Sequence, residues 1–143
     1  MKTKIIAEIG WNHMGDMDLA KEMIAAAKES GADYAKFQTW SVKNLKPGPW
    51  DKDGRLEIYK KAEITKDKHH LLKQHCDNVG ISFLTSIFNI QDVGWLSKLN
   101  DKIIKVPSHE VHNSKLIEEL DGKFESILIS TGASKWNEIE LIR

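Results

Sequence analysis

Short runs of β-branched and aromatic residues alternate with amphipathic helical patterns along the whole chain. This alternation is typical of parallel βαβ units, because a helix-length segment follows each strand-like run. The runs predict strands at Lys4–Gly10, Tyr34–Trp40, Ser82–Phe88, Lys102–Ser108 and Ser126–Gly132. The helical patterns predict helices at Leu19–Ser30, Lys66–Val79, Ile90–Leu99, Ser114–Leu120 and Trp136–Arg143. The pattern therefore predicts an α/β fold with parallel strands.

The helix boundaries carry recognisable capping residues. Asp16 or Asp18 is predicted to cap the first helix, because a carboxylate oxygen can accept from the free N–H groups there. Gly31 is predicted to end that helix and Gly80 the second, since glycine adopts the left-handed conformation at helix ends.

The connection Ser41–Thr65 is long for a loop between a strand and a helix. Pro47, Gly48 and Pro49 are predicted to break regular structure in it. Long loops on α/β enzymes commonly form lids or substrate walls, so we expect one of these roles here.

The charge balance excludes a basic nucleic-acid-binding protein, because Lys+Arg and Asp+Glu both number 21. No apolar run approaches the ~20 residues of a membrane span. We therefore expect a cytoplasmic protein with no nucleic-acid or membrane partner. The single cysteine, Cys76, lies in a helical pattern and is expected to fill space in the core.

Polar residues gather where the predicted strands end, which is where parallel α/β proteins bind ligands. Lys36 and Lys105 lie in two of these strands, and hydroxyl residues follow several of them. Ammonium and hydroxyl groups suit a phosphorylated ligand. Internal salt bridges explain the two lysines equally well, and single hydroxyls can simply cap helices.

The histidines carry a weaker indication of function. His109 and His112 flank Glu110, but their spacing matches no defined zinc pattern. His69, His70 and His75 lie on a polar helical pattern and are expected at the solvent-exposed surface. His13 is of interest for its position after the first strand.

Five segments together resemble the N-acetylneuraminate (sialic acid) synthase family. They are IIAEIGWNHMGD, SGADYAKFQTW, ISFLTSIF, IKVPSHEVHN and ILISTGASKWNEI. The resemblance covers nearly the whole chain and implies a partial TIM-type (β/α) barrel, with about five of the eight units. It also implies condensation of phosphoenolpyruvate with an N-acetylated hexosamine such as N-acetylmannosamine, with release of phosphate.

The resemblance further implies roles for individual residues. The phosphoenolpyruvate contacts would be Lys36, Thr85, Ser108 and Ser130. Gln38 and Glu110 would contact the sugar. Glu8 would be the catalytic carboxylate, for proton transfer or for orienting the attacking water. A divalent metal, Mn²⁺ or Mg²⁺, and a homodimer are implied for the complete enzyme, with no metal ligands identified in this chain.

Three motifs depart from the usual family pattern: NHMGD stands for NHNGD, TSIFN for an STPFD-like turn, and STGA for STGM. Met14 is expected to remove an amide from the site mouth. The remaining strands, the two metal-binding histidines and a C-terminal domain are expected to lie beyond Arg143, so residues 1–143 are expected to be inactive alone. A remnant that only binds phosphoenolpyruvate or phosphate, and a structural fragment with no ligand, remain as alternatives.

Overall fold

The strands of the computed structural model, which describes residues 3–45, 47–132 and 134–140, follow one another across a sheet in the order β1-β2-β3-β4-β5. The pairs β1–β2, β3–β4 and β4–β5 are parallel. The strands are β1 Ile6–Gly10, β2 Tyr34–Thr39, β3 Ser82–Ile87, β4 Ile103–Val106 and β5 Ser126–Ile129. The predicted parallel α/β class is confirmed, and each strand is somewhat shorter than predicted.

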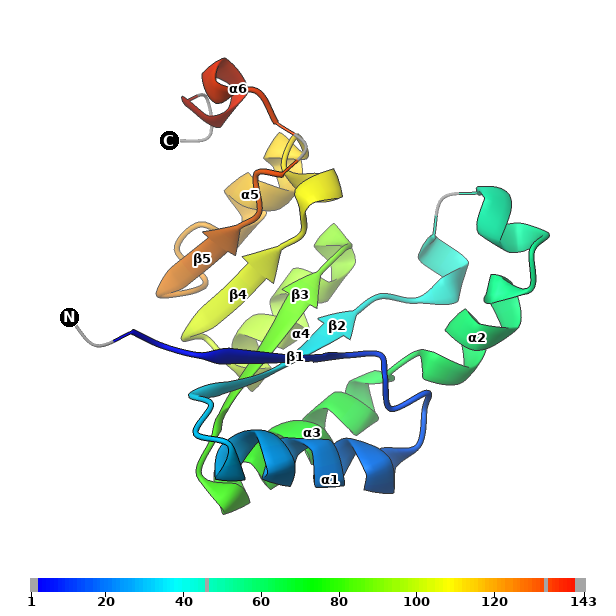
Figure 1. The fold of residues 1–143 in the computed structure, drawn as a ribbon. Coiled ribbons are helices and arrows are strands. Elements are labelled where there is room, and N and C mark those ends of the chain that lie inside the picture. The colour runs from blue at the N-terminus through cyan, green and yellow to red at the C-terminus, as the bar shows by residue number, and fades with distance from the viewer. Residues whose placement is uncertain (1–2, 46, 133, 141–143) are drawn as a thin grey trace. The chain divides into compact units, whose positions relative to one another are not determined.

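The helices follow the strands as the pattern predicts (Figure 1). They are α1 Met17–Glu29, α2 Arg55–Ala62, α3 Lys66–Val79, α4 Val93–Leu99, α5 Ser114–Leu120 and α6 Trp136–Glu140. Short 3-10 turns occupy η1 Val42–Asn44, η2 Pro49–Asp51, η3 Ile90–Asp92 and η4 Ser108–Glu110. Residues 141–143 of the last predicted helix lie outside the described residues. Among the helices of the described residues, none is both long and apolar enough to cross a membrane.

The predicted caps are present at the ends of α1 and α3. The Asp16 carboxylate accepts hydrogen bonds from the backbone N–H groups of Asp18 and Leu19, so α1 begins two residues before its predicted start. Gly31 follows α1 with φ +83°, and Gly80 ends α3 in the left-handed conformation.

The prediction that Ser41–Thr65 lacks regular structure is wrong, because it contains α2 as well as η1 and η2. The helix breakers Pro47, Gly48 and Pro49 all precede α2. The α2 sequence RLEIYKKA has no proline or glycine and is rich in residues with high helix propensity. The breakers therefore limit where the helix begins and do not prevent it.

The chain divides into two compact units, Met1–Thr85 and Ser86–Arg143. In the first unit, α1 and α3 lie beside each other (Figure 1), and the rings of Phe37 and Phe83 stack at 5.9 Å. Cys76 is buried as predicted, and burial raises the pKa of its thiol to about 12.

The surface assignment of His69 is wrong, because its side chain is 0% exposed. His69, Leu72 and Cys76 follow one another at helical spacing and form the buried stripe of α3. His70, one residue away, is exposed as predicted. Helical position, not residue type, decides which of these neighbouring histidines is buried.

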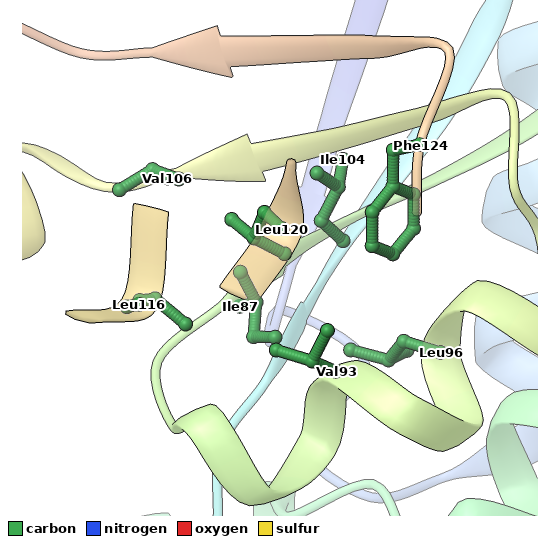
Figure 2. Packing of buried hydrophobic residues seen from close by; sticks show 8 residues of the cluster. All are labelled: Ile87, Val93, Leu96, Ile104, Val106, Leu116, Leu120 and Phe124. Carbon is green, nitrogen blue, oxygen red and sulfur yellow. The ribbon is translucent and has the colours of Figure 1, made fainter. Parts of the chain in front are cut away.

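The core of the second unit joins its strands to α4 and α5 (Figure 2). Its buried residues are Ile87, Val93, Leu96, Ile104, Val106, Leu116, Leu120 and Phe124. Ile104 and Val106 alternate with Lys105 along β4. The core therefore occupies one face of β4 and leaves Lys105 on the opposite face.

Candidate functional site

A buried ammonium group lies on β2, paired with a carboxylate on β1. Glu8 and Lys36 are register partners in the parallel pair. Their Oε2 and Nζ atoms are 2.5 Å apart, although the Lys36 side chain is 4% exposed and that of Glu8 is 53% exposed. The internal salt bridge offered as one explanation of Lys36 is thus present. It also holds a partly exposed carboxylate at a fixed position near the end of a strand.

Gln38 lies two residues beyond Lys36 on the same strand and is half-buried. A Cβ atom on Gly10 would lie 3.3 Å from Glu8 Oε1 and 3.5 Å from Gln38 Nε2. Gly10 therefore borders both polar side chains at the end of β1. The structure brings Glu8, Lys36 and Gln38 together.

Thr85 belongs to a different set of contacts, on the side of the sheet that α3 covers. Its Oγ1 lies 2.8 Å from Thr39 Oγ1, which lies 2.8 Å from His69 Nε2. Thr39 alternates with Lys36 and Gln38 along β2, so the two sets lie on opposite faces of the strand.

The turn after β1 places a buried imidazole. His13 is 0% exposed, and its Nδ1 accepts a hydrogen bond from the Gly15 backbone N–H at 3.0 Å. Its Nε2 has no hydrogen-bond partner among the described residues. Burial lowers the pKa of His13, and the nearby Lys68 ammonium acts in the same direction.

Aromatic rings fix α2 against the segments that leave β1 and β2. The Tyr59 ring lies 5.8 Å from that of Trp11 and 5.6 Å from those of both Trp40 and Trp50. Glu63 joins the two ends of the Ser41–Thr65 connection. Its carboxylate accepts hydrogen bonds from the Ser41 hydroxyl and from the Val42 backbone N–H, each at 2.9 Å. These contacts favour the role of a fixed wall over that of a lid for Ser41–Thr65.

In the second unit, an ammonium group lies beside a hydroxyl where two parallel strands end. Lys105 Nζ donates to Ser130 Oγ at 2.5 Å. The Ser130 backbone N–H donates to the Val106 carbonyl at 3.0 Å, which carries the β4–β5 ladder one residue past β5. Ser86 is the register partner of Lys105 and is buried. Ser86 is thus the hydroxyl of β3 that lies beside Lys105 in the ladder.

Ser108 and Glu110 lie in the 3-10 turn that follows β4. Ser108 is half-buried and Glu110 is buried. Glu110 Oε2 accepts from Asn113 Nδ2 at 2.8 Å, while Asn113 caps α5 through its own carbonyl oxygen. The cap of α5 therefore holds Glu110 in place.

The divalent metal implied by the family resemblance finds no ligand set among the described residues. No group of three His, Cys, Asp or Glu side chains there is close enough to hold an ion. His109 and His112 are both exposed, and the His109 ring contacts Phe88 at 5.2 Å. The described residues do not fit the metal, and no chemical step is assigned to one.

Three features of these residues were not predicted from the sequence: the burial of His69, the position of Ser86 and the contacts of Tyr59. The helical spacing of His69 with Leu72 and Cys76 could have indicated its burial. Strand alternation could have separated Ser86 from Thr85, since adjacent residues of a strand face opposite sides. The contacts of Tyr59 had no comparable signal, because they join residues distant in the sequence.

Comparison with known proteins places these residues in a family context. Residues 23–142 match the NeuB family. The N,N'-diacetyllegionaminic acid synthase of Campylobacter jejuni is 36% identical, over 97% of this chain and 45% of that protein. The human N-acetylneuraminate-9-phosphate synthase is 34% identical, over 96% of this chain and 41% of that protein.

A solved structure agrees with the sequence relatives. The N-acetylneuraminic acid synthetase of Leptospira borgpetersenii, determined in complex with citrate, superposes with a TM-score of 0.88 and 28% identity. The match covers 99% of this chain and 49% of that one. The chain thus spans less than half the length of these relatives. Since the family match extends over most of its residues, the chain belongs to the NeuB family.

Proposed function

We propose that this chain carries the phosphoenolpyruvate-binding part of a nonulosonate synthase. The reaction would condense phosphoenolpyruvate with an N-acetylated hexosamine and release phosphate, in the cytoplasm and in a homodimeric enzyme. The names of the two relatives support a synthase of this class. The observation that carries the proposal is the Lys105 ammonium beside the Ser130 hydroxyl at the strand ends.

Phosphoenolpyruvate has an anionic phosphate and an anionic carboxylate, so its binding site needs cations and hydrogen-bond donors. In the second unit, Lys105 supplies an ammonium, and Ser130, Ser86 and Ser108 supply hydroxyls. Lys36, in the first unit, is proposed as a further contact because its motif resembles that of the family. Each ammonium is held by a neighbouring side chain, Lys36 by Glu8 and Lys105 by Ser130, which limits the entropy that must be lost on binding.

Glu8 is proposed as the carboxylate that moves or directs a proton. In the condensation, the terminal methylene carbon of phosphoenolpyruvate would form a bond to the aldehyde carbon of the sugar, and the aldehyde oxygen would take up a proton. Water would then add to the neighbouring, phosphate-bearing carbon and lose a proton, and this carbon would expel phosphate to become a ketone. A half-exposed carboxylate fixed by Lys36 suits either transfer.

Gln38 and Glu110 are proposed to contact the acceptor sugar. Sugar hydroxyls both donate and accept, so an amide, which can do both, and a carboxylate, which accepts, are each suited to contact them. Glu110 is held by Asn113, and Gln38 lies beside Gly10.

The proposal is tested by measuring phosphate release from phosphoenolpyruvate in the presence of Mn²⁺ with each of three acceptors. The acceptors are N-acetylmannosamine, its 6-phosphate and a 2,4-diacetamido hexose. Acceptor-dependent release that is lost in Glu8→Gln supports the synthase. Calorimetric binding of phosphoenolpyruvate without release agrees with the expected inactivity of residues 1–143 alone and with the binding-only alternative. Absence of binding contradicts the proposal that this chain carries the phosphoenolpyruvate-binding part.

A further inference from the structure

An exposed imidazole, that of His109, lies in the turn that follows β4. In this turn, η4, His109 stands between Ser108 and Glu110 of the candidate site. Its ring lies against that of Phe88, with the ring centroids 5.2 Å apart and the planes at 45°. Phe88 is the first residue after β3 and is half-buried. The exposed imidazole therefore packs on a ring at the end of the neighbouring strand.

Strand alternation places Phe88 on the face of the sheet that carries Lys105. Ile87 belongs to the core of the second unit (Figure 2), and the backbone is still extended at Asn89, so Phe88 faces away from that core. Ser86, on the other side of Ile87, shares this face and is the register partner of Lys105. The two rings in contact therefore lie on the face of Lys105, opposite the core.

The rings also lie toward the carboxyl ends of the strands, where parallel α/β proteins bind ligands. Phe88 is two residues past Ser86, a rise of about 6.6 Å along the strand. The Lys105 ammonium reaches the same end of the sheet, because Nζ donates to the hydroxyl of Ser130, the residue that follows β5. An imidazole, an ammonium and a hydroxyl thus gather at one end of the second unit.

We propose that His109 is a further binding residue of this site, and that its ring N–H donates to an anionic oxygen of the ligand that Lys105 and Ser130 contact. The inference rests on the proposed function in taking phosphoenolpyruvate as that ligand. An imidazole has at least one N–H group in each of its charge states, so it can act as a donor in both. Phosphate and carboxylate oxygens accept such hydrogen bonds, and their charge strengthens them.

Two substitutions of His109 separate binding from packing. His109→Phe keeps a ring beside Phe88 and removes both ring nitrogens. His109→Gln removes the ring and keeps an N–H donor. A residue that only packs on Phe88 would tolerate the first change better, whereas a hydrogen-bond donor to the ligand would tolerate the second better. His112→Phe is the control, because His112 is also exposed and lies just after η4.

The first test measures the affinity of each variant for phosphoenolpyruvate by calorimetric titration. We expect binding to weaken by at least about fivefold in His109→Phe, to stay within about threefold in His109→Gln, and to be unchanged in His112→Phe. Unchanged affinity in His109→Phe, a larger loss in His109→Gln, or an equal loss in His112→Phe would overturn the inference.

The second test follows the ¹H–¹⁵N signals of the His109 ring during titration with phosphoenolpyruvate, inorganic phosphate and pyruvate. Shifts that the His112 ring does not share are expected, and the last two ligands show whether phosphate or carboxylate supplies the oxygen. Binding of phosphoenolpyruvate that leaves the His109 signals unmoved would overturn the inference and leave the proposed function intact. If phosphoenolpyruvate does not bind, the proposed function fails, and the anion contact of His109 then stands only if inorganic phosphate or pyruvate moves its signals.

Discussion

The Glu8–Lys36 ion pair joins a nearly buried ammonium to a half-exposed carboxylate, so its two members should respond differently to removal. Glu8→Ala leaves a buried charge without its partner, whereas Lys36→Met leaves a carboxylate that water can solvate. We expect Glu8→Ala to lower the free energy of unfolding by about 2 kcal/mol more than Lys36→Met. Urea denaturation of both variants measures the difference. Equal losses would show that solvent reaches the ammonium more freely than its burial indicates.

Met14 has a positive φ of 50°, a backbone conformation that residues other than glycine, asparagine and aspartate rarely adopt. Asparagine, which the family resemblance leads us to expect at this position, adopts a positive φ more readily than methionine and also carries a side-chain amide. Met14→Asn is expected to stabilise the protein by about 0.5–1 kcal/mol, measured as an increase in the denaturation midpoint. A decrease would show that packing of the methionine side chain matters more than its backbone conformation.

The placement of individual side chains was only partly predictable from the sequence. Alternation along β2 is readable from the sequence and places Lys36 and Gln38 on one face and Thr39 on the other. It could not reveal that Glu8 pairs with Lys36, because the register of two strands depends on long-range contacts. The family motif assigned Thr85 to phosphoenolpyruvate, whereas the structure joins Thr85 to Thr39 and places the neighbouring Ser86 beside Lys105 in the ladder.

At the scale of elements, α2 packs closely against the turn after β1. A Cβ atom on Gly15 would lie 1.9 Å from the Lys61 carbonyl oxygen, whereas one on Gly31 would meet nothing within 4 Å. Both glycines have φ +83°, so Gly31→Ala is a matched control for backbone strain. Gly15→Ala is expected to cost at least about 2 kcal/mol more than Gly31→Ala, measured by thermal or urea unfolding. Similar losses would mean that α2 can move away from the turn at little cost.

Most strand and helix locations followed from hydrophobic periodicity, because helices such as α1 and α3 each bury one stripe of residues. The caps at Asp16 and Gly80 were predictable, since they depend on local chemistry. Helix α2 was missed because proline and glycine earlier in the connection outweighed its own helix-forming residues. Its position depends on the contacts of Tyr59 with three tryptophans, which no local pattern reveals.

At the scale of the whole molecule, buried histidines couple stability to pH. The pKa of His69 is lowered to about 4 in the folded protein, from 6.5, so the unfolded chain binds this proton more readily. Its contribution to stability is therefore fully present above pH 6.5 and is lost as the pH falls toward 4, by about 3 kcal/mol in total. The pKa of His13 is also lowered, so it acts in the same direction.

This pH dependence is measured by urea denaturation at several values between about pH 7.5 and pH 4.5. His69→Gln removes the titrating group and should flatten the curve. His70→Gln, at the exposed neighbouring position, should leave the curve unchanged. A curve of equal slope in His69→Gln would assign the pH dependence to other groups.

The central claim is that the chain binds phosphoenolpyruvate through cations at its strand ends. Isothermal titration of the protein with phosphoenolpyruvate tests it most directly, with Lys105→Met compared with Lys102→Met. Lys105 lies beside Ser130. Lys102 lies just before β4, is exposed, and forms an ion pair with Glu125. The account predicts measurable binding that weakens by at least about tenfold in Lys105→Met and is unchanged in Lys102→Met. Absence of binding by the unsubstituted protein, or equal affinity in the two variants, would contradict it.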